Sequence, residues 1–211
     1  MSNFPDPVIV SDPASWWRRL CRVTDQLHLC GDLPHGFRDA KRDLKGWVAA
    51  GVTHIVDVRG EYSDQDFVAS HQPQMVYAFH GTHDNGGPQA HAWFDGAVDS
   101  VVNAIQVDPQ NQVVVHCHMG VNRAPSLAFA ALLVLGHGIT EALTAIRTAR
   151  PIARILYADS AVQWFGDREG WSEDQILVAR QEAKNWHKQN PVDAGWVISR
   201  IRKEERVNAC K

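Results

Sequence analysis

The segment from Val113 to Ser126 constrains the fold of this chain more than any other part of it. It reads Val-Val-Val-His-Cys-His-Met-Gly-Val-Asn-Arg-Ala-Pro-Ser. The three β-branched valines predict a short buried strand, whereas the apolar run from Ala124 to Leu135, with Pro125 in its first turn, predicts a buried helix. The residues between them must therefore form a tight connection from strand to helix.

A connection of this kind is suited to hold an anion. The backbone N–H groups of residues 118–123 can converge on one point, and the helix N-terminus adds a partial positive charge there. The same groups stabilise a thiolate at Cys117, and the planar guanidinium of Arg123 matches two phosphate oxygens. His-Cys-x-x-Gly-x-x-Arg arises by chance about once in 1,000 chains of this composition, which disfavours the alternative of a structural cysteine.

At these residues the chain resembles the cysteine-based protein tyrosine phosphatase superfamily, and most closely its dual-specificity branch, whose signature is His-Cys-x-x-Gly-x-x-Arg. Three other segments are similar to that family: Leu27 to Gly31 to its first strand and turn, Gly51 to Val58 to a later strand, and Glu141 to Pro151 to a helix end. The resemblance covers about residues 25–165.

The order of predicted elements indicates an α/β fold. Helices and strands alternate, which predicts a central, mostly parallel sheet of four to five strands flanked by helices, as the resemblance also implies. The predicted strands are Leu27–Leu29, Val52–Val58, Met75–Phe79 and Val113–Val115, and the predicted helices include Arg38–Ala50, a segment between Pro88 and Gln106, and residues 172–205 with a break at Pro191 and Gly195. We expect a single phosphatase domain over residues 1–211, with its core at about 25–165 and a helical C-terminal extension over 166–211.

The resemblance implies a role for each residue of the loop. Cys117 is the nucleophile, Arg123 grips the phosphoryl oxygens, and His116 orients the cysteine loop by hydrogen bonding. Gly120 allows tight curvature. The remaining members of the phosphate-binding loop, which supply mainly backbone donors, are His118, Met119, Val121 and Asn122. The implied reaction passes through a thiophosphate intermediate and requires no metal or other cofactor.

A phosphate ester also needs a proton for its leaving oxygen, so we expect a carboxylic acid beyond the end of another strand. Asp84 follows the strand Met75–Phe79 in the mobile-looking stretch Gly-Thr-His-Asp-Asn-Gly-Gly. The family's acid lies at a similar separation from the cysteine, which favours Asp84. Asp95 is a weaker candidate because it falls inside a predicted helix, and Asp84 could alternatively be a turn residue that caps its own loop.

One position departs from the family pattern. The family usually has Ser or Thr directly after the arginine, where the hydroxyl stabilises the thiolate and assists breakdown of the phosphoenzyme. Here that position is Ala124. The substitution predicts a slow second step, because Ser126 lies too far along the helix to replace the missing hydroxyl.

Charge and cysteine usage limit the partners and the cellular location. The formal net charge is −3, so no global basic field attracts nucleic acid or an anionic membrane. The four cysteines lack the spacing of a metal site or disulfide framework, which favours a reducing compartment. No apolar segment resembles a signal core or membrane span, so we expect a cytoplasmic protein. The oligomeric state stays open.

We therefore expect a cysteine-dependent phosphatase for phosphate monoesters on proteins or peptides, with phosphotyrosine as substrate and phosphoserine and phosphothreonine as further candidates. Ala124 keeps open a phosphate-binding pseudophosphatase that acts as an adaptor. The stretch Gly-Val-Asn-Arg has some likeness to phosphatases acting on RNA 5′ ends, and Asp57-Val58-Arg59 to rhodanese-like sulfurtransferases. A metal site at His116-Cys117-His118 is disfavoured, because consecutive strand residues point to opposite faces.

Overall fold

The computed structural model describes residues 16–209 and contains a five-stranded sheet. The strands occur in the order β1-β2-β5-β3-β4. Strands β2, β5, β3 and β4 are parallel to their neighbours, and β1 pairs with β2 in the antiparallel sense. The bounds are Cys21–Arg22 for β1, Leu27–Cys30 for β2, His54–Arg59 for β3, Val76–Thr82 for β4 and Val113–His116 for β5. The predicted mostly parallel sheet is thus confirmed.

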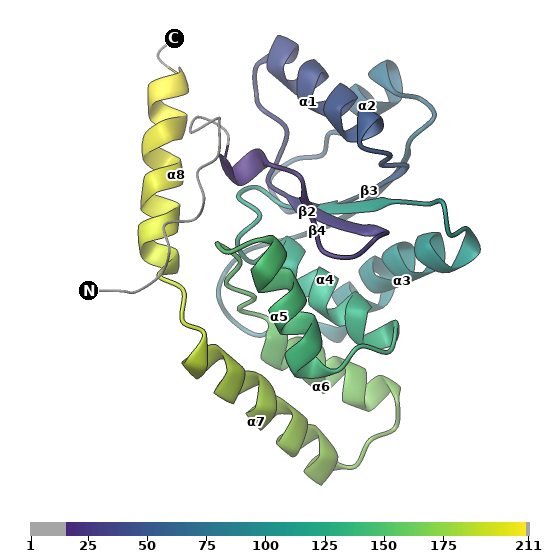
Figure 1. Cartoon of the computed structure of the whole chain (residues 1–211), viewed down its shortest axis with the longest axis vertical. Coiled ribbons are helices and arrows are strands. Elements are labelled where there is room, and N and C mark those ends of the chain that lie inside the picture. Colours follow the sequence, from purple (N-terminus) through teal and green to yellow (C-terminus); the bar gives the residue numbers. More distant parts are fainter. Residues whose placement is uncertain (1–15, 210–211) are drawn as a thin grey trace.

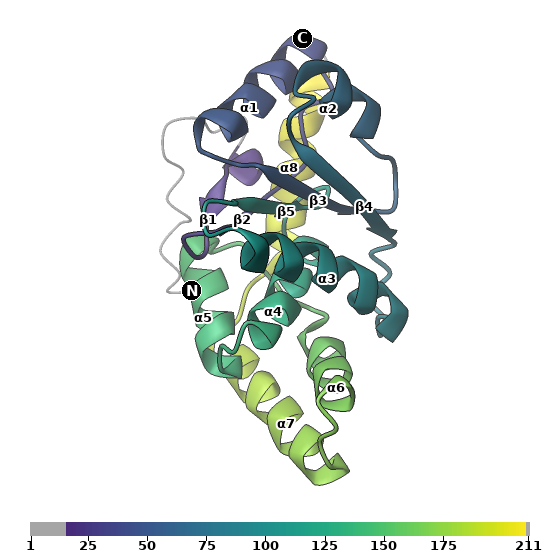
Figure 2. The ribbon, with the colours of Figure 1, turned by 90° about the vertical axis from the view of Figure 1, so that its right-hand side faces the viewer.

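Helices cover both faces of the sheet (Figures 1 and 2). Helices α1 and α2 lie on one face, and α3, α4 and α5 lie on the other, with α6 and α7 farther from the sheet. The bounds are Trp16–Arg18 for the 3₁₀ helix η1, Phe37–Ala49 for α1, Gln65–His71 for α2, His91–Val107 for α3, Arg123–Val134 for α4, Ile139–Ala149 for α5, Ala158–Arg168 for α6, Glu173–Gln189 for α7 and Ala194–Ala209 for α8.

Strand β5 shows how the side-chain alternation of a strand divides the core. Val113 and Val115 pack in the cluster around α4, whereas Val114 packs in the cluster of the opposite face, together with Trp47 of α1. His116 follows the same alternation, because its ring lies 5.6 Å from the Trp47 ring. The strand therefore delivers His116 to the α1 side as it enters the loop.

Helix α4 is buried from Arg123 to Leu133, because the sheet and helices α3, α5 and α6 surround it. A helix enclosed on every side needs apolar residues all round, and the sequence supplies them. Each fully buried large side chain such as Leu127 or Phe129 contributes about 1.5–3 kcal/mol. This burial fixes the helix whose N-terminus carries Arg123.

Three details differ from the sequence prediction. Strand β1 has two residues and α2 has seven, and both are too short to show a periodic pattern. The break near Pro191 falls between Gln189 and Ala194, but Gly195 lies inside α8. Proline ends α7 because it lacks the N–H that a helix interior needs, whereas a glycine in a first turn is tolerated.

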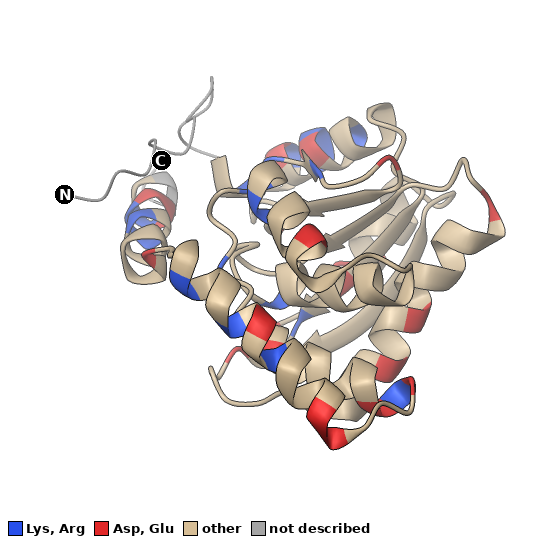
Figure 3. Cartoon of the chain, turned by 60° about the horizontal axis from the view of Figure 1, so that its bottom comes forward, with Lys and Arg blue, Asp and Glu red and all other residues tan. Residues whose placement is uncertain are grey.

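The described part of the chain carries charges of both signs. Acidic and basic residues are interspersed along α7 (Figure 3), in agreement with the small net charge of the whole sequence. Over residues 16–209, no helix has the combination of length and apolar character needed to cross a membrane.

A buried ion-pair network joins β3 to its neighbours. The Nη2 atom of Arg59 donates hydrogen bonds of 2.6 Å to both Asp57 and Asp64, and Tyr77 of β4 donates its hydroxyl to Asp57 at 2.6 Å. The Arg59 and Asp57 side chains have no solvent exposure. Burial opposes the charge of Arg59, but its hydrogen bonds to Asp57 and the nearby carboxylates raise its pKa. The charges of Arg59 and Asp57 are therefore paired where water cannot reach them.

Replacing Arg59 with methionine should remove about 3–5 kcal/mol from the free energy of unfolding, because it leaves Asp57 buried without a cation. Chemical denaturation measures this loss. The matched control is Arg42→Met, since Arg42 pairs with Asp39 on the exposed surface of α1 and such pairs contribute about 0–1 kcal/mol. Equal destabilisation by the two substitutions would show that the network does not support the fold.

Candidate active site

The candidate site lies where the parallel strands end. Cys30 of β2 and Asp57 of β3 both pair in register with His116 of β5, so these three strand ends meet at one edge of the sheet. Cys117 follows β5 directly and is 2% exposed. The carboxyl ends of parallel strands are the usual place for a ligand in such folds.

The carbonyl groups of residues 118–121 all point out of the loop and accept hydrogen bonds there. The acceptor–donor pairs are His118 with the Asp32 N–H at 2.9 Å, Met119 with Arg150 Nη2 at 3.0 Å, Gly120 with Arg150 Nε at 2.5 Å, and Val121 with the Arg154 N–H at 2.6 Å. A run of carbonyls held outward turns the N–H groups of the same peptides toward the opposite side. The N–H groups of residues 119–122 therefore face away from these donors, an arrangement that suits the anion expected from the sequence.

Gly120 is required by both conformation and space. Its φ angle is +61°, in the left-handed region that other residues rarely adopt. A Cβ atom here would lie 2.5 Å from the Cys30 carbonyl oxygen and would overlap the guanidinium of Arg150. Arg150 is itself buried, and sequence reasoning missed its role although it belongs to the segment Glu141–Pro151.

Arg123 is held by groups from the loop after β3 and from the end of β4. Its Nη1 and Nη2 atoms donate to Glu61 at 2.7 and 2.8 Å, and Nη1 also donates to the Thr82 carbonyl at 2.9 Å. Burial opposes the Arg123 charge, but the hydrogen bond to Glu61 and the nearby charges of Cys117 and Asp84 raise its pKa. Its buried Nε has no hydrogen-bond partner among the described residues and is left for an anion oxygen. Glu61 belongs to no motif and was missed from the sequence.

Asp84 lies beside this loop, as the sequence predicts. Its Oδ1 atom accepts hydrogen bonds from Asn122 Nδ2 at 2.6 Å and from the Tyr157 hydroxyl at 2.7 Å. Its Oδ2 atom lies 3.7 Å from Arg123 Nε. The stretch that looked mobile in the sequence is joined by these hydrogen bonds to the residues before α4 and α6.

The structure also shows what surrounds Ala124. Its side chain is fully buried and offers no hydroxyl. The Ser126 hydroxyl donates to Asn122 Oδ1 at 3.3 Å and accepts the Tyr157 N–H at 3.2 Å. The Ser126 hydroxyl thus bonds to Asn122 and Tyr157, and it does not take the place of the hydroxyl missing at position 124.

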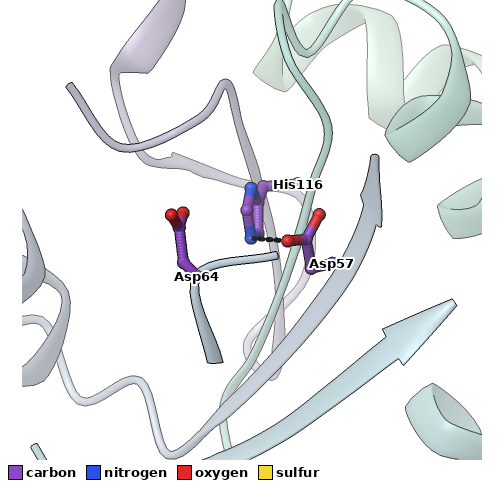
Figure 4. Close-up of side chains that lie close together, drawn as sticks. All are labelled: Asp57, Asp64 and His116. Carbon is purple, nitrogen blue, oxygen red and sulfur yellow. Dashed lines mark ion pairs between the residues drawn. The ribbon is translucent and has the colours of Figure 1, made fainter. Parts of the chain in front are cut away.

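Asp57, Asp64 and His116 lie close enough to suggest a metal site (Figure 4). The cation position between the two carboxylates is already filled, because Arg59 donates to both of them at 2.6 Å. The His116 Nε2 atom lies 3.8 Å from Asp57, and burial lowers the His116 pKa more than the Asp57 charge raises it. We therefore interpret the cluster as an ion-pair network beneath the loop.

His118 connects the loop to Asp32 and to the C-terminal helix α8. Its Nδ1 atom lies 2.8 Å from buried Asp32, and its Nε2 atom lies 3.3 Å from Glu205 of α8. The hydrogen bond to Asp32 raises the His118 pKa. Helix α8 also packs Val197 and Ile201 against the cluster that contains Val121. The predicted C-terminal extension thus reaches the loop at residues 117–123.

Comparisons with known proteins agree with this geometry, although no protein-family model matches the chain. The human protein named dual specificity protein phosphatase 13B is 28% identical over 155 residues, which span 72% of this chain and 78% of that protein. Its mouse counterpart is 25% identical over 160 residues, with the same coverage.

Solved structures share the fold. Human DUSP28 superimposes with a TM-score of 0.57 at 19% identity, covering 72% of this chain and 98% of the other. A mouse putative dual specificity phosphatase, complexed with zinc tungstate, superimposes with a TM-score of 0.57 at 16% identity, covering 83% and 98%. In sequence, in fold and in its His-Cys-x-x-Gly-x-x-Arg loop, this chain is thus similar to dual-specificity phosphatases of the cysteine-based protein tyrosine phosphatase superfamily.

Proposed function

We propose that this protein is a cysteine-dependent phosphatase that hydrolyses phosphate monoesters on proteins or peptides, with phosphotyrosine, phosphoserine and phosphothreonine as the substrate class. The observation that carries the proposal is the loop at residues 117–123. It combines a nucleophile, four peptides whose carbonyls are held outward, and an arginine whose Nε has no partner among the described residues. Tungstate, present in the mouse relative's complex, is a tetrahedral oxyanion like phosphate and supports an oxyanion site here.

In the first step, Cys117 Sγ attacks phosphorus while the bond to the leaving oxygen breaks. Asp84 gives that oxygen its proton, and Arg123 with the loop N–H groups stabilises the charge on the phosphoryl oxygens. In the second step, Asp84 takes a proton from water, whose oxygen bonds to phosphorus as the sulfur–phosphorus bond breaks. Inorganic phosphate leaves and the thiolate is restored.

The rim of the site favours a peptide over a polyanionic substrate. Glu61 and Asp84 are partly exposed beside Arg123, and Glu205 lies beside His118. Acidic groups at the rim repel the additional phosphates of a nucleic acid or a phosphoinositide headgroup. A phosphorylated peptide brings one dianion and otherwise variable charge, which suits this rim better.

A second candidate function is a phosphate-binding pseudophosphatase, and Ala124 is the observation that favours it. Without the hydroxyl, a phosphoenzyme formed at Cys117 would break down slowly. Such a protein would bind phosphorylated partners through the same loop. The presence of Cys117, Arg123 and Asp84 around one site makes the catalytic function the better supported one.

A cytoplasmic location is part of the proposal, because the reaction needs a reduced thiol. Cys21, Cys30 and Cys117 carry free thiols, which suits a reducing compartment. Cys210 lies outside the described residues.

Replacing Cys117 with serine should abolish turnover of 4-nitrophenyl phosphate, because the nucleophile is lost. Replacing Asp84 with asparagine should lower kcat by about 10²–10⁴-fold for substrates with poor leaving groups, since the proton donor is lost. Steady-state kinetics measures both effects, and Asp99→Asn on the surface of α3 is the matched control. Full activity of the Cys117→Ser protein would contradict the proposed mechanism.

Replacing Ala124 with serine should speed the second step, because the new hydroxyl at the helix start can assist departure of the thiolate. The wild-type protein should release a burst of 4-nitrophenol equal to its concentration of sites, followed by slow turnover. The serine variant should show faster turnover and a smaller burst. Rapid-mixing kinetics measures both, and identical time courses for the two proteins would show that Ala124 does not limit the reaction.

A further inference from the structure

We propose that Asn122 and Tyr157 are positioning residues that orient the Asp84 carboxyl group for proton transfer. The inference rests on the proposed function. It assigns a chemical role to an asparagine side chain that the sequence suggested only as part of the loop backbone, and to a tyrosine that lies outside every motif.

The two donors act on one oxygen of Asp84. Asn122 Nδ2 and the Tyr157 hydroxyl both bond to Oδ1, at 2.6 and 2.7 Å. A protonated carboxyl group has one oxygen that accepts hydrogen bonds and one that carries the proton. Because Oδ1 accepts twice, the proton belongs on Oδ2. That oxygen lies 3.7 Å from Arg123 Nε, on the side where the phosphoryl group binds.

The orientation of the Asn122 amide is fixed by its other neighbours. Its Oδ1 atom accepts the Leu156 backbone N–H at 2.7 Å and the Ser126 hydroxyl at 3.3 Å. A backbone N–H can only donate, so the oxygen of the amide must face Leu156 and the nitrogen must face Asp84. Asn122 is 6% exposed, which leaves little room for another arrangement.

The Tyr157 hydroxyl is oriented in the same way. It accepts the Gly86 N–H at 3.4 Å, so its own proton is free to point to Asp84. Burial raises the Tyr157 pKa, and the hydrogen bond to Asp84 raises it further, which keeps the hydroxyl a donor. The Tyr157 backbone N–H bonds to Ser126, so ring and hydroxyl are held at a defined distance from α4.

The backbone before Tyr157 is strained, which is consistent with a segment held in place for function. Buried Ile155 has a φ angle of +53°, a costly conformation for a β-branched residue. The residues on both sides of it bond to the phosphate-binding loop, Arg154 N–H to the Val121 carbonyl and Leu156 N–H to Asn122. The same short segment thus fixes the loop and, through Tyr157, the acid.

This arrangement matters most for substrates whose leaving oxygen needs a proton. Phenolates with electron-withdrawing groups depart unaided, whereas the alkoxides of serine and threonine are poor leaving groups. An acid oriented before substrate arrives lowers the barrier selectively for the second class. The hydrogen bonds of Asn122 and Tyr157 to Asp84 therefore favour alkyl phosphates, including phosphoserine and phosphothreonine, among the proposed substrates.

The experiment compares kcat/KM for 4-nitrophenyl phosphate and phenyl phosphate, a good and a poor leaving group, in Tyr157→Phe and Asn122→Ala. We expect a decrease of about 10–100-fold for phenyl phosphate and of less than about threefold for 4-nitrophenyl phosphate. In the Asp84→Ala background, Tyr157→Phe should have no further effect, because the two groups act as one unit. Asn103→Ala on the exposed face of α3 is the control for the asparagine.

Tyr157→Phe keeps the ring and its packing, so it serves as the test even where Asn122→Ala fails to fold. Equal losses with the two substrates, or a full additional loss in the Asp84→Ala background, would overturn the inference while leaving the phosphatase function in place. A wild-type protein without turnover dependent on Cys117 would instead overturn the proposed function, and the inference with it.

Discussion

The site depends on the outward hydrogen bonds of the carbonyls at residues 118–121. A buried carbonyl without a donor costs about 1–3 kcal/mol, so four consecutive ones can persist only if other segments supply their partners. Arg150 supplies two of these donors, and the backbones of Asp32 and Arg154 supply the others. Once these bonds form, the N–H groups of the same peptides face the opposite side of the loop, an arrangement that suits an anion.

The segment after α5 links this loop to the acid. Arg150 and Arg154 hold the carbonyls, and three residues later Tyr157 reaches Asp84. Asn122 joins the two sets, because it belongs to the loop and bonds to both Leu156 and Asp84. One continuous hydrogen-bonded assembly thus joins the loop that carries Cys117 and Arg123 to Asp84, which explains how segments that follow separate strands keep a fixed geometry.

The sequence predicted those features that depend on neighbouring residues. The valines of β5, the glycine and arginine of the loop and the apolar α4 are local patterns, and they were sufficient to indicate the strand, the turn and the helix. Asp84 was identified by its place after a strand, and the structure puts it beside Arg123.

The missed features arise from contacts between distant segments. Glu61 reaches Arg123 from the loop after β3, and Glu205 reaches His118 from the far end of the chain. Neither residue belongs to a recognisable sequence motif, and glutamates usually face solvent. The hydrogen-bond partners of Asp84 could not be predicted for a similar reason, because they lie in distant segments, directly before α4 and α6.

The most direct measurement is acid quenching of the wild-type protein during turnover of a phosphorylated peptide, followed by mass spectrometry of its proteolytic fragments. The account predicts a phosphate on the fragment that contains Cys117 and its absence from the Cys117→Ser protein. Turnover without a covalent phosphate, or a phosphate on another residue, would contradict the assignment of Cys117 as nucleophile.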